Sequence, residues 1–146
     1  GSMESIVAGS ALHNTAYGYK SLCSLTSGDY NTAYGSCTLV ANTTGTQNIA
    51  IGRHALGANT TASYNVGIGH EALGVNTTGA KNVAVGRLTL VGNTSGSDNA
   101  ALGAKALEQN TTGSNNSALG YASLNNNTTA SNNTAVGYYA LLLNTT

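Results

Sequence analysis

The stretch Asn82-Val83-Ala84-Val85-Gly86 opens a sequence unit that recurs eight times along this chain of 146 residues. Each unit begins with Asn, has Gly at its fifth position and has Leu at its ninth position. Eight copies at a constant period indicate a stack of equivalent structural units. The unit-initial asparagines are Asn14, Asn31, Asn48, Asn65, Asn82, Asn99, Asn116 and Asn133, and the repeated glycines and leucines include Gly52, Gly69, Gly86, Leu56, Leu73 and Leu90.

The first five positions of the unit alternate as a β-strand does. Position 4 is always apolar, from Tyr17 in the first unit to Val136 in the eighth, and position 2 lies on the same face. Position 3 lies on the opposite face and is Ala in every copy except Gly67. We therefore expect position 4 to be buried, tyrosines included. The small position 3 is expected to mark a surface that another backbone approaches closely.

The rest of the unit predicts one further short element and a corner. Positions 6 to 11 fit either a second strand or one helical turn, with the Leu of position 9 pointing inward in both cases. Positions 12 to 15 are rich in Asn, Thr and Gly, which are typical of turns. Ala62 and Ala130 replace the Gly of position 15, so this corner does not strictly require a left-handed residue there.

These features predict a mainly β fold, a β-solenoid or β-roll of 17-residue coils. Coils stacked at the spacing of neighbouring strands, about 4.8 Å, would form a rod roughly 40 Å long in which the Asn of position 1 makes a ladder of amides. Each coil brings only about two large apolar residues against the cost of ordering its backbone. We therefore expect the chains to associate through the position 3 face, with three chains around one axis as the natural arrangement for a fibre.

The chain divides into three segments. Residues 1–3, Gly-Ser-Met, resemble the remnant of an expression vector. Residues 4–13 fit the repeat poorly and are interpreted as an N-terminal cap or a boundary to a preceding domain. Residues 14–146 hold the eight repeats, of which the last is truncated.

Composition argues against several classes of function. Charged residues make up 7% of the chain, Lys and Arg together number five, and the net charge is zero, so a nucleic-acid partner is not expected. An apolar run of about 20 residues is missing, so this segment is not expected to insert into a membrane. The carboxylates are dispersed, and the sequence offers neither a Ser-His-Asp arrangement nor a cluster of metal ligands. We expect no enzyme activity, no catalytic or metal site and no cofactor.

The repeats resemble those of known fibre proteins. Asn133-Thr-Ala-Val-Gly-Tyr-Tyr-Ala-Leu-Leu-Leu-Asn-Thr-Thr146 resembles repeats of phage and large-virus tail-fibre proteins and of bacterial surface-fibre proteins. The strand portion, Asn-x-Ala-Val/Ile-Gly, is similar to the head repeats of trimeric autotransporter adhesins, which are shorter than the repeats of this chain. The resemblance covers residues 14–146. It implies a homotrimeric, extracellular fibre segment on a cell surface or virion that serves attachment, with a cell-surface glycan or protein as receptor and no catalytic residue.

Side chains outside the repeat consensus are candidates for binding. Tyr19, Tyr121, Tyr138 and Tyr139 occupy the variable positions 6 and 7, which we expect to face solvent, where tyrosine is a common recognition residue.

Cys23 and Cys37 do not share a repeat position, and either two free thiols or a disulfide, which could join two chains, is compatible with the pattern. His54 and His70 have no recurring carboxylate partner and are interpreted as surface residues. A histidine near a threefold axis could instead meet two copies of itself and bind a metal.

Two alternatives remain at this stage. The first is a monomeric solenoid that binds a regular surface such as ice or polysaccharide through its threonines. Positions 13 and 14 are both Thr in most copies, but in an extended segment they would point to opposite faces, which weakens this interpretation. The second is a fibre-borne glycan hydrolase, for which the sequence provides no pair of carboxylates.

Overall fold

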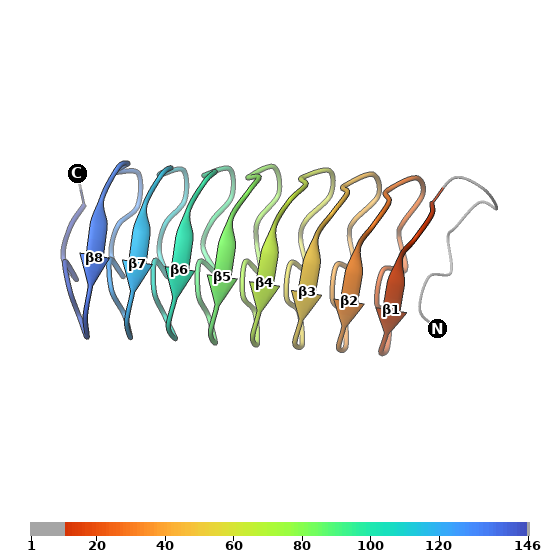
Figure 1. Ribbon diagram of the computed structural model, residues 1–146, viewed down its shortest axis with the longest axis horizontal. Coiled ribbons are helices and arrows are strands. Elements are labelled where there is room, and N and C mark those ends of the chain that lie inside the picture. Colours follow the sequence, from red (N-terminus) through yellow and green to blue (C-terminus); the bar gives the residue numbers. More distant parts are fainter. Residues whose placement is uncertain (1–10, 146) are drawn as a thin grey trace.

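The computed structural model describes residues 11–145. The chain forms a single stack of coils, one for each repeat of the sequence and each carrying one strand (Figure 1). This confirms the predicted β-solenoid. The eight strands are β1 Thr15–Tyr17, β2 Thr32–Tyr34, β3 Ile49–Ile51, β4 Val66–Ile68, β5 Val83–Val85, β6 Ala100–Leu102, β7 Ser117–Leu119 and β8 Thr134–Val136.

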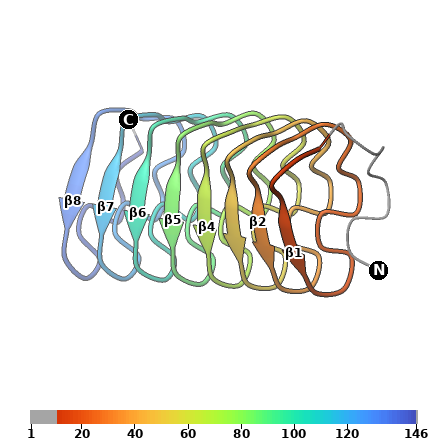
Figure 2. The same cartoon turned by 45° about the vertical axis from the view of Figure 1, so that its right-hand side comes forward.

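The strands form one parallel sheet in which chain order and spatial order are the same. Each residue pairs with its equivalent in the next repeat, so Ala50 lies beside Gly67 and Ile51 beside Ile68. In Figure 2 the strands form one wall of the stack and the remaining segments close the coil on the other side. The constant period therefore brings equivalent positions of the repeat into continuous rows along the long axis of the molecule.

Positions 6 to 11 form turns in every described coil, not the second strand or helical turn that the sequence left open. The reason is a pair of left-handed residues in each coil. His54 at position 7 and Leu56 at position 9 have φ angles of 57° and 51°, and the other coils repeat this conformation. A left-handed residue interrupts both a strand and a right-handed helix. The backbone still bonds to the next coil, for example from Leu56 N–H to the Ala72 carbonyl at 3.0 Å.

The face of the strand that points inward is the opposite of the predicted one. Ala50 and Ala84, at position 3, are fully buried, whereas Ile51 of position 4 is 38% exposed and Tyr17 is 65% exposed. The coil is narrow, and the leucine of position 9 fills the space behind the strand. A Cβ added at Gly67 would lie 3.1 Å from the Ala72 carbonyl oxygen and 3.3 Å from Leu56 Cγ. A backbone therefore does approach position 3 closely, as predicted, but it belongs to the same chain. Because position 3 is buried inside the coil, the expected association of chains through this face is wrong.

The interior combines leucine with two ladders of asparagine. The position 9 leucines from Leu22 to Leu124 are completely buried, which confirms their predicted role. Asn65 accepts hydrogen bonds at Oδ1 from Asn82 N–H at 3.0 Å and from Asn82 Nδ2 at 3.2 Å. It also donates from Nδ2 to the Gly79 carbonyl at 3.0 Å. The predicted asparagine ladder is therefore present.

The asparagine of position 12 forms a second ladder. Asn76 donates from Nδ2 to Asn59 Oδ1 at 3.2 Å and to the Gly79 carbonyl at 2.8 Å. In the first coil the fully buried Leu25 occupies the same position. Polar side chains thus fill part of the interior, and each is satisfied by a neighbouring coil.

The glycine of position 5 is required by both conformation and space. Gly52 has a φ of +120°, and a Cβ there would lie 2.7 Å from the carbonyl carbon of Gly69 in the next coil. Glycine alone meets both constraints. The chain turns at this point from the strand into the edge that carries position 6.

Candidate functional site

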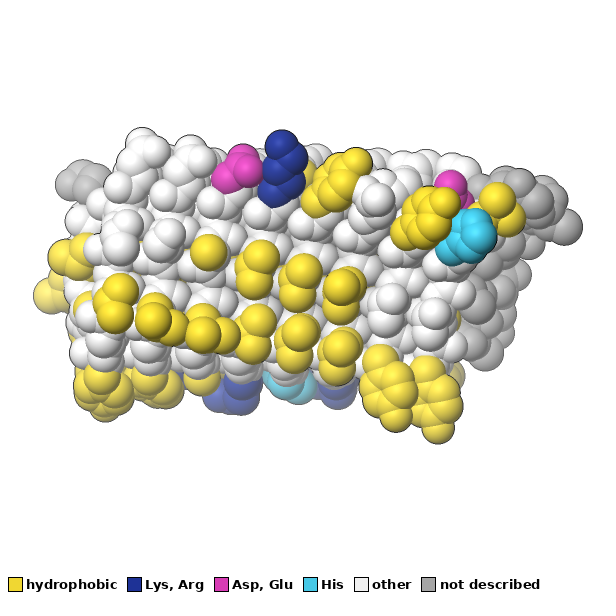
Figure 3. Space-filling view, viewed as in Figure 1, with side chains coloured by type: hydrophobic (Ala, Val, Ile, Leu, Met, Phe, Trp, Pro, Cys, Tyr) yellow, Lys and Arg dark blue, Asp and Glu magenta, His cyan; other side chains and the backbone are white. Residues whose placement is uncertain are grey.

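The outer face of the sheet is mainly apolar and carries no charge. None of the sixteen residues at positions 2 and 4 of the eight strands is charged. Ile49 and Leu102 are 39% and 49% exposed, and Figure 3 shows the hydrophobic side chains in two adjacent rows. Surface sheets usually carry charged residues that prevent edge or face association. We define the residues at positions 2 and 4 of β1–β8 as the sheet face.

The two rows of the sheet face complement each other in size. In β6 and β7 the residues of position 2 are the small Ala100 and Ser117, and those of position 4 are Leu102 and Leu119. The small residues leave an open hollow of about 300 Å³ over β5–β8. In β3 both rows carry isoleucine. The sheet face therefore has projections along one row and recesses along the other at β6 and β7, whereas both rows project at β3.

The edge that follows the strands carries the position 6 side chains. We define the residues Tyr19, Ser36, Arg53, His70, Arg87, Ala104, Tyr121 and Tyr138 as the tyrosine–arginine edge. Tyr19 and Tyr138 are 63% and 72% exposed, which confirms their predicted exposure. In Figure 3 hydrophobic groups lie near both ends of this lower edge, with basic groups and histidine between them.

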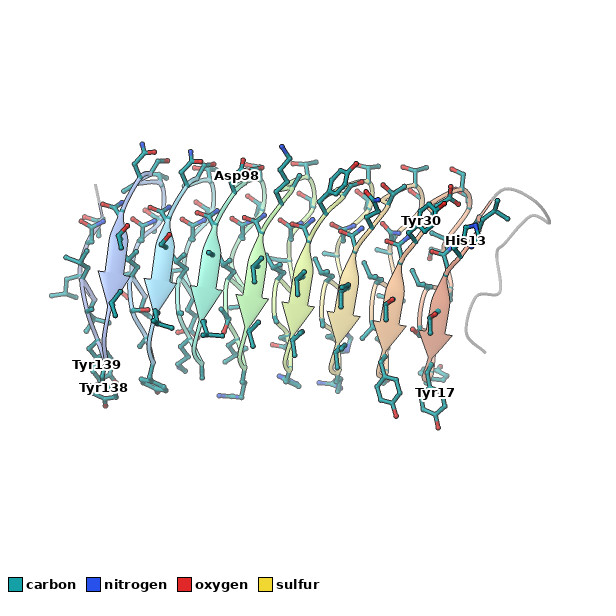
Figure 4. The ribbon with its side chains drawn as sticks, viewed as in Figure 1. His13, Tyr17, Tyr30, Asp98, Tyr138 and Tyr139 are labelled. Atoms are coloured by element: carbon teal, nitrogen blue, oxygen red, sulfur yellow. The ribbon has the colours of Figure 1, made fainter. Side chains whose placement is uncertain are left out.

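Three tyrosines meet at the C-terminal end of this edge. Tyr121 and Tyr138 stack with ring centroids 5.5 Å apart, and Tyr139 lies edge-on to Tyr138 at 4.3 Å (Figure 4). A hydrogen bond with the Tyr138 side chain raises the pKa of the Tyr139 phenol above its ordinary value. The repeat period thus gathers Tyr121, Tyr138 and Tyr139 into one exposed aromatic cluster, and the fourth predicted residue, Tyr19, lies at the other end of the same edge.

Tyrosines at the N-terminal end form a second aromatic group. Tyr17 and Tyr34 stack with ring centroids 4.8 Å apart and are both more than half exposed, so the expectation that they are buried is wrong. The Nζ of Lys20 lies 5.4 Å from the centroid of the Tyr19 ring. The cause of the tyrosine exposure is the inverted strand face, which directs position 4 outward.

The middle of the edge is basic. Arg53 Nη1 lies 3.1 Å from His70 Nε2, and His70 Nε2 lies 3.7 Å from Glu71 Oε1. Within residues 11–145, neither Arg53 nor Arg87 forms an ion pair with an acidic side chain. The two arginines are two coils apart and are both exposed. Sequence reasoning missed them, although aligning the repeats places both at position 6.

The threonines lie on the side where the coil returns toward the next strand. Thr77 of position 13 donates from Oγ1 to the Thr94 carbonyl at 2.9 Å, and other coils repeat this bond. Thr77 and Thr78 are both exposed and form a bend, so the extended segment on which the opposite-face expectation depended is not present. The segment is bent and not extended. The described residues of position 14 are exposed in every coil.

The remaining candidate side chains of residues 11–145 are two cysteines and a histidine. Cys23 and Cys37 are half-buried, and no disulfide joins them to each other. His54 and Glu71 line a hollow of about 310 Å³ with Gly74, Val75 and Val91. Over residues 11–145, no group of three or more His, Cys, Asp and Glu side chains could hold a metal ion. The same part of the chain contains no helix that is long and apolar enough to cross a membrane.

Comparison with family models, with curated proteins and with solved structures finds no match for this chain.

Proposed function

We propose that this chain is a structural and adhesive segment of an extracellular fibre, in which three copies pack in parallel through their sheet faces. The observation that supports this proposal best is the sheet face itself, where aliphatic side chains are exposed and charge is absent. Eight strands of three residues make a strip of about 400 Å², the size at which an exposed apolar patch on a monomer is often functional.

A further copy of the chain suits this face better than an unrelated partner. Every coil presents the sheet face at the same axial spacing, so a parallel copy meets it coil for coil. Rotation about an axis along the stack brings the position 4 row of one copy against the position 2 row of the next. Leu102 and Leu119 of one chain would then fill the space beside Ala100 and Ser117 of its neighbour. The number of three follows from the resemblance to trimeric fibre and adhesin repeats.

The solution mass of the protein, measured by light scattering, tests this proposal. We expect three times the mass of one chain, both with and without a reductant. Replacing Ile51 and Val85 together by Lys should give single chains, because two charges would be buried in each copy of the interface. Replacing Thr44 and Thr78 by Lys introduces the same charges two coils apart on another side and should preserve the mass. A wild-type mass of one chain would refute the trimer, and a trimer lost only on reduction would assign association to Cys23 or Cys37.

A second candidate is a monomeric solenoid that binds a regular surface such as ice or polysaccharide. The observation in its favour is the row of exposed position 14 hydroxyls, which includes Thr44, Thr61 and Thr78. The position 13 hydroxyls already donate to backbone carbonyls, so the position 14 row is the one that could meet an external surface. Thermal hysteresis at high protein concentration tests ice binding directly. Activity that disappears when Thr61 and Thr78 are replaced by Lys would favour this candidate over the fibre.

A further inference from the structure

We propose that the tyrosine–arginine edge binds an acidic polysaccharide that runs parallel to the long axis of the stack, with one carboxylate in each disaccharide. The first step of the argument is alignment. The eight side chains of this edge share position 6 of the repeat, so they follow one line along the molecule at about 4.8 Å per coil. A line of exposed groups along a rigid rod is suited to an extended polymer, whereas a small molecule would use only part of it.

The second step concerns charge. Arg53 and Arg87 are exposed, lack an acidic partner within residues 11–145, and lie two coils apart, which corresponds to about 10 Å. A polysaccharide with alternating acidic and neutral sugars presents its carboxylates at a comparable interval. The guanidinium group binds a carboxylate with two parallel hydrogen bonds. The neighbouring His70 contacts Arg53 at 3.1 Å and so holds this side chain along the edge.

The third step concerns the aromatic ends. Tyr19 begins the edge and Tyr121 and Tyr138 end it, all with exposed rings. A tyrosine ring provides a flat apolar surface for the C–H groups of a sugar and a hydroxyl for hydrogen bonding. The contacts with Tyr121 and Tyr139 hold the Tyr138 ring in place before any ligand arrives. The edge therefore has tyrosine rings at both ends and arginines between them. This arrangement suits a polymer whose sugars stack on the tyrosine rings and whose carboxylates form ion pairs with the arginines.

The opposite edge of the stack does not combine aromatic ends with basic residues between them as position 6 does. That edge carries position 17, and its basic residue Lys81 is followed in the next coil by the acidic Asp98. Its tyrosines, Tyr30 and Tyr64, are exposed but lie in coils separated by Gln47. The opposite edge therefore provides matched control positions with similar exposure.

This inference rests on the proposed attachment function for its biological meaning, but it does not require three chains. The test is isothermal titration of the folded protein with a hyaluronate hexasaccharide, in which carboxylates alternate with neutral sugars. We expect binding that weakens as salt increases, and at least a tenfold loss of affinity when Arg53 and Arg87 are both replaced by Gln. Replacing both by Lys should restore only part of the affinity, because the charge remains but the two-pronged hydrogen bonding is lost. Lys81→Gln should bind as the wild type does.

Further titrations with other variants and ligands distinguish an acidic polysaccharide from a neutral polysaccharide and from nucleic acid. Tyr19→Ala combined with Tyr138→Ala should weaken binding, whereas Tyr64→Ala on the opposite edge should not. A neutral chitin hexasaccharide of the same length should bind at least tenfold more weakly. The proposal is overturned if hyaluronate does not bind, if the arginine variant binds normally, or if chitin binds equally well. A single-stranded oligothymidylate that binds more tightly than hyaluronate would also overturn it. The mass of the wild-type protein is measured separately, so failure of the trimer and failure of this site are distinguishable.

Discussion

At the scale of single residues, the most unusual property of this chain is its use of left-handed residues other than glycine. Positions 7, 9 and 17 have φ between 46° and 64° in every coil where they are described. Such a residue costs about 1–2 kcal/mol, and β-branched side chains tolerate the conformation worst. None of the left-handed residues is Val, Ile or Thr, although Thr is abundant in the sequence. The absence of β-branched residues from three columns of the repeat is therefore the sequence signature of this backbone.

This signature leads to a prediction at Gln47, an exposed residue of position 17 with a φ of 56°. Gln47→Val should lower the free energy of unfolding by about 1 kcal/mol, because the branched side chain adds a clash to the left-handed cost that Gln47 already bears. Gln47→Asn should be neutral or slightly stabilising, since Asn tolerates this region and already occurs there as Asn115. Denaturant unfolding measures both changes.

The control for this prediction is Thr44→Val at position 14. Thr44 is exposed and is not among the left-handed residues, so the same side chain should change stability by less than about 0.5 kcal/mol. Equal effects of valine at positions 44 and 47 would show that backbone conformation is not the cause.

The sequence permitted the strand residues to be identified but not the face that they bury. Alternation shows only that positions 2 and 4 share a face, and apolarity suggested that this face is internal. The deciding information lies elsewhere in the coil. The invariant leucine of position 9 fills a narrow interior, as the contact between Leu56 and the position of Gly67 shows, so only Ala or Gly fits opposite it. The aliphatic residues at positions 2 and 4 therefore lie on the surface, where they are available for contact with another chain.

At the scale of the coil, hydrogen-bonded asparagines replace much of the apolar core of an ordinary domain. The ladder of position 1 was predicted because an Asn at a strict period in stacked coils has its equivalents as neighbours, but the ladder of position 12 was not predicted, since that position was assigned to a corner. The turns at positions 6 to 11 could not be predicted from the sequence, since no propensity rule favours a left-handed Leu at position 9. Burial of that leucine and the bond from its N–H to the next coil compensate for its unfavourable backbone.

The asparagine ladder gives a prediction at Asn65, which is fully buried. Asn65→Ala removes the acceptor for Asn82 N–H and one of the two donors to the Gly79 carbonyl, which Asn76 still bonds, so one buried backbone N–H is left unpaired. An unpaired buried backbone group costs about 1–3 kcal/mol, and we expect a loss of that size in the free energy of unfolding. Gln109→Ala is the control, because this exposed side chain bonds only to Asn126 at the surface. A loss below about 1 kcal/mol for Asn65→Ala would contradict a structural role of the ladder.

At the scale of the whole molecule, stability is expected to follow the number of intact coils and not the number of residues. Each coil contacts only its neighbours, and the sheet register advances by one whole repeat at every step. Deleting residues 65–98 removes two whole coils and joins Tyr64 to Asn99, which recreates the ordinary junction between positions 17 and 1. We expect this variant to fold cooperatively with a moderately lower Tm, as in other stacked-repeat proteins.

A shorter deletion should be more damaging than this longer one. Deleting residues 65–88 joins Tyr64 to Thr89 and leaves a partial coil that has positions 8 to 17 but no strand. The remaining residues cannot surround the interior, so the ladders on the two sides lose contact and the stack is expected to unfold in two separate steps. Thermal unfolding followed by far-UV circular dichroism compares the two variants. In an ordinary globular domain the larger deletion should cause the larger loss of stability. If the 65–88 variant is as stable as the 65–98 variant, the coils are not independent units of stability.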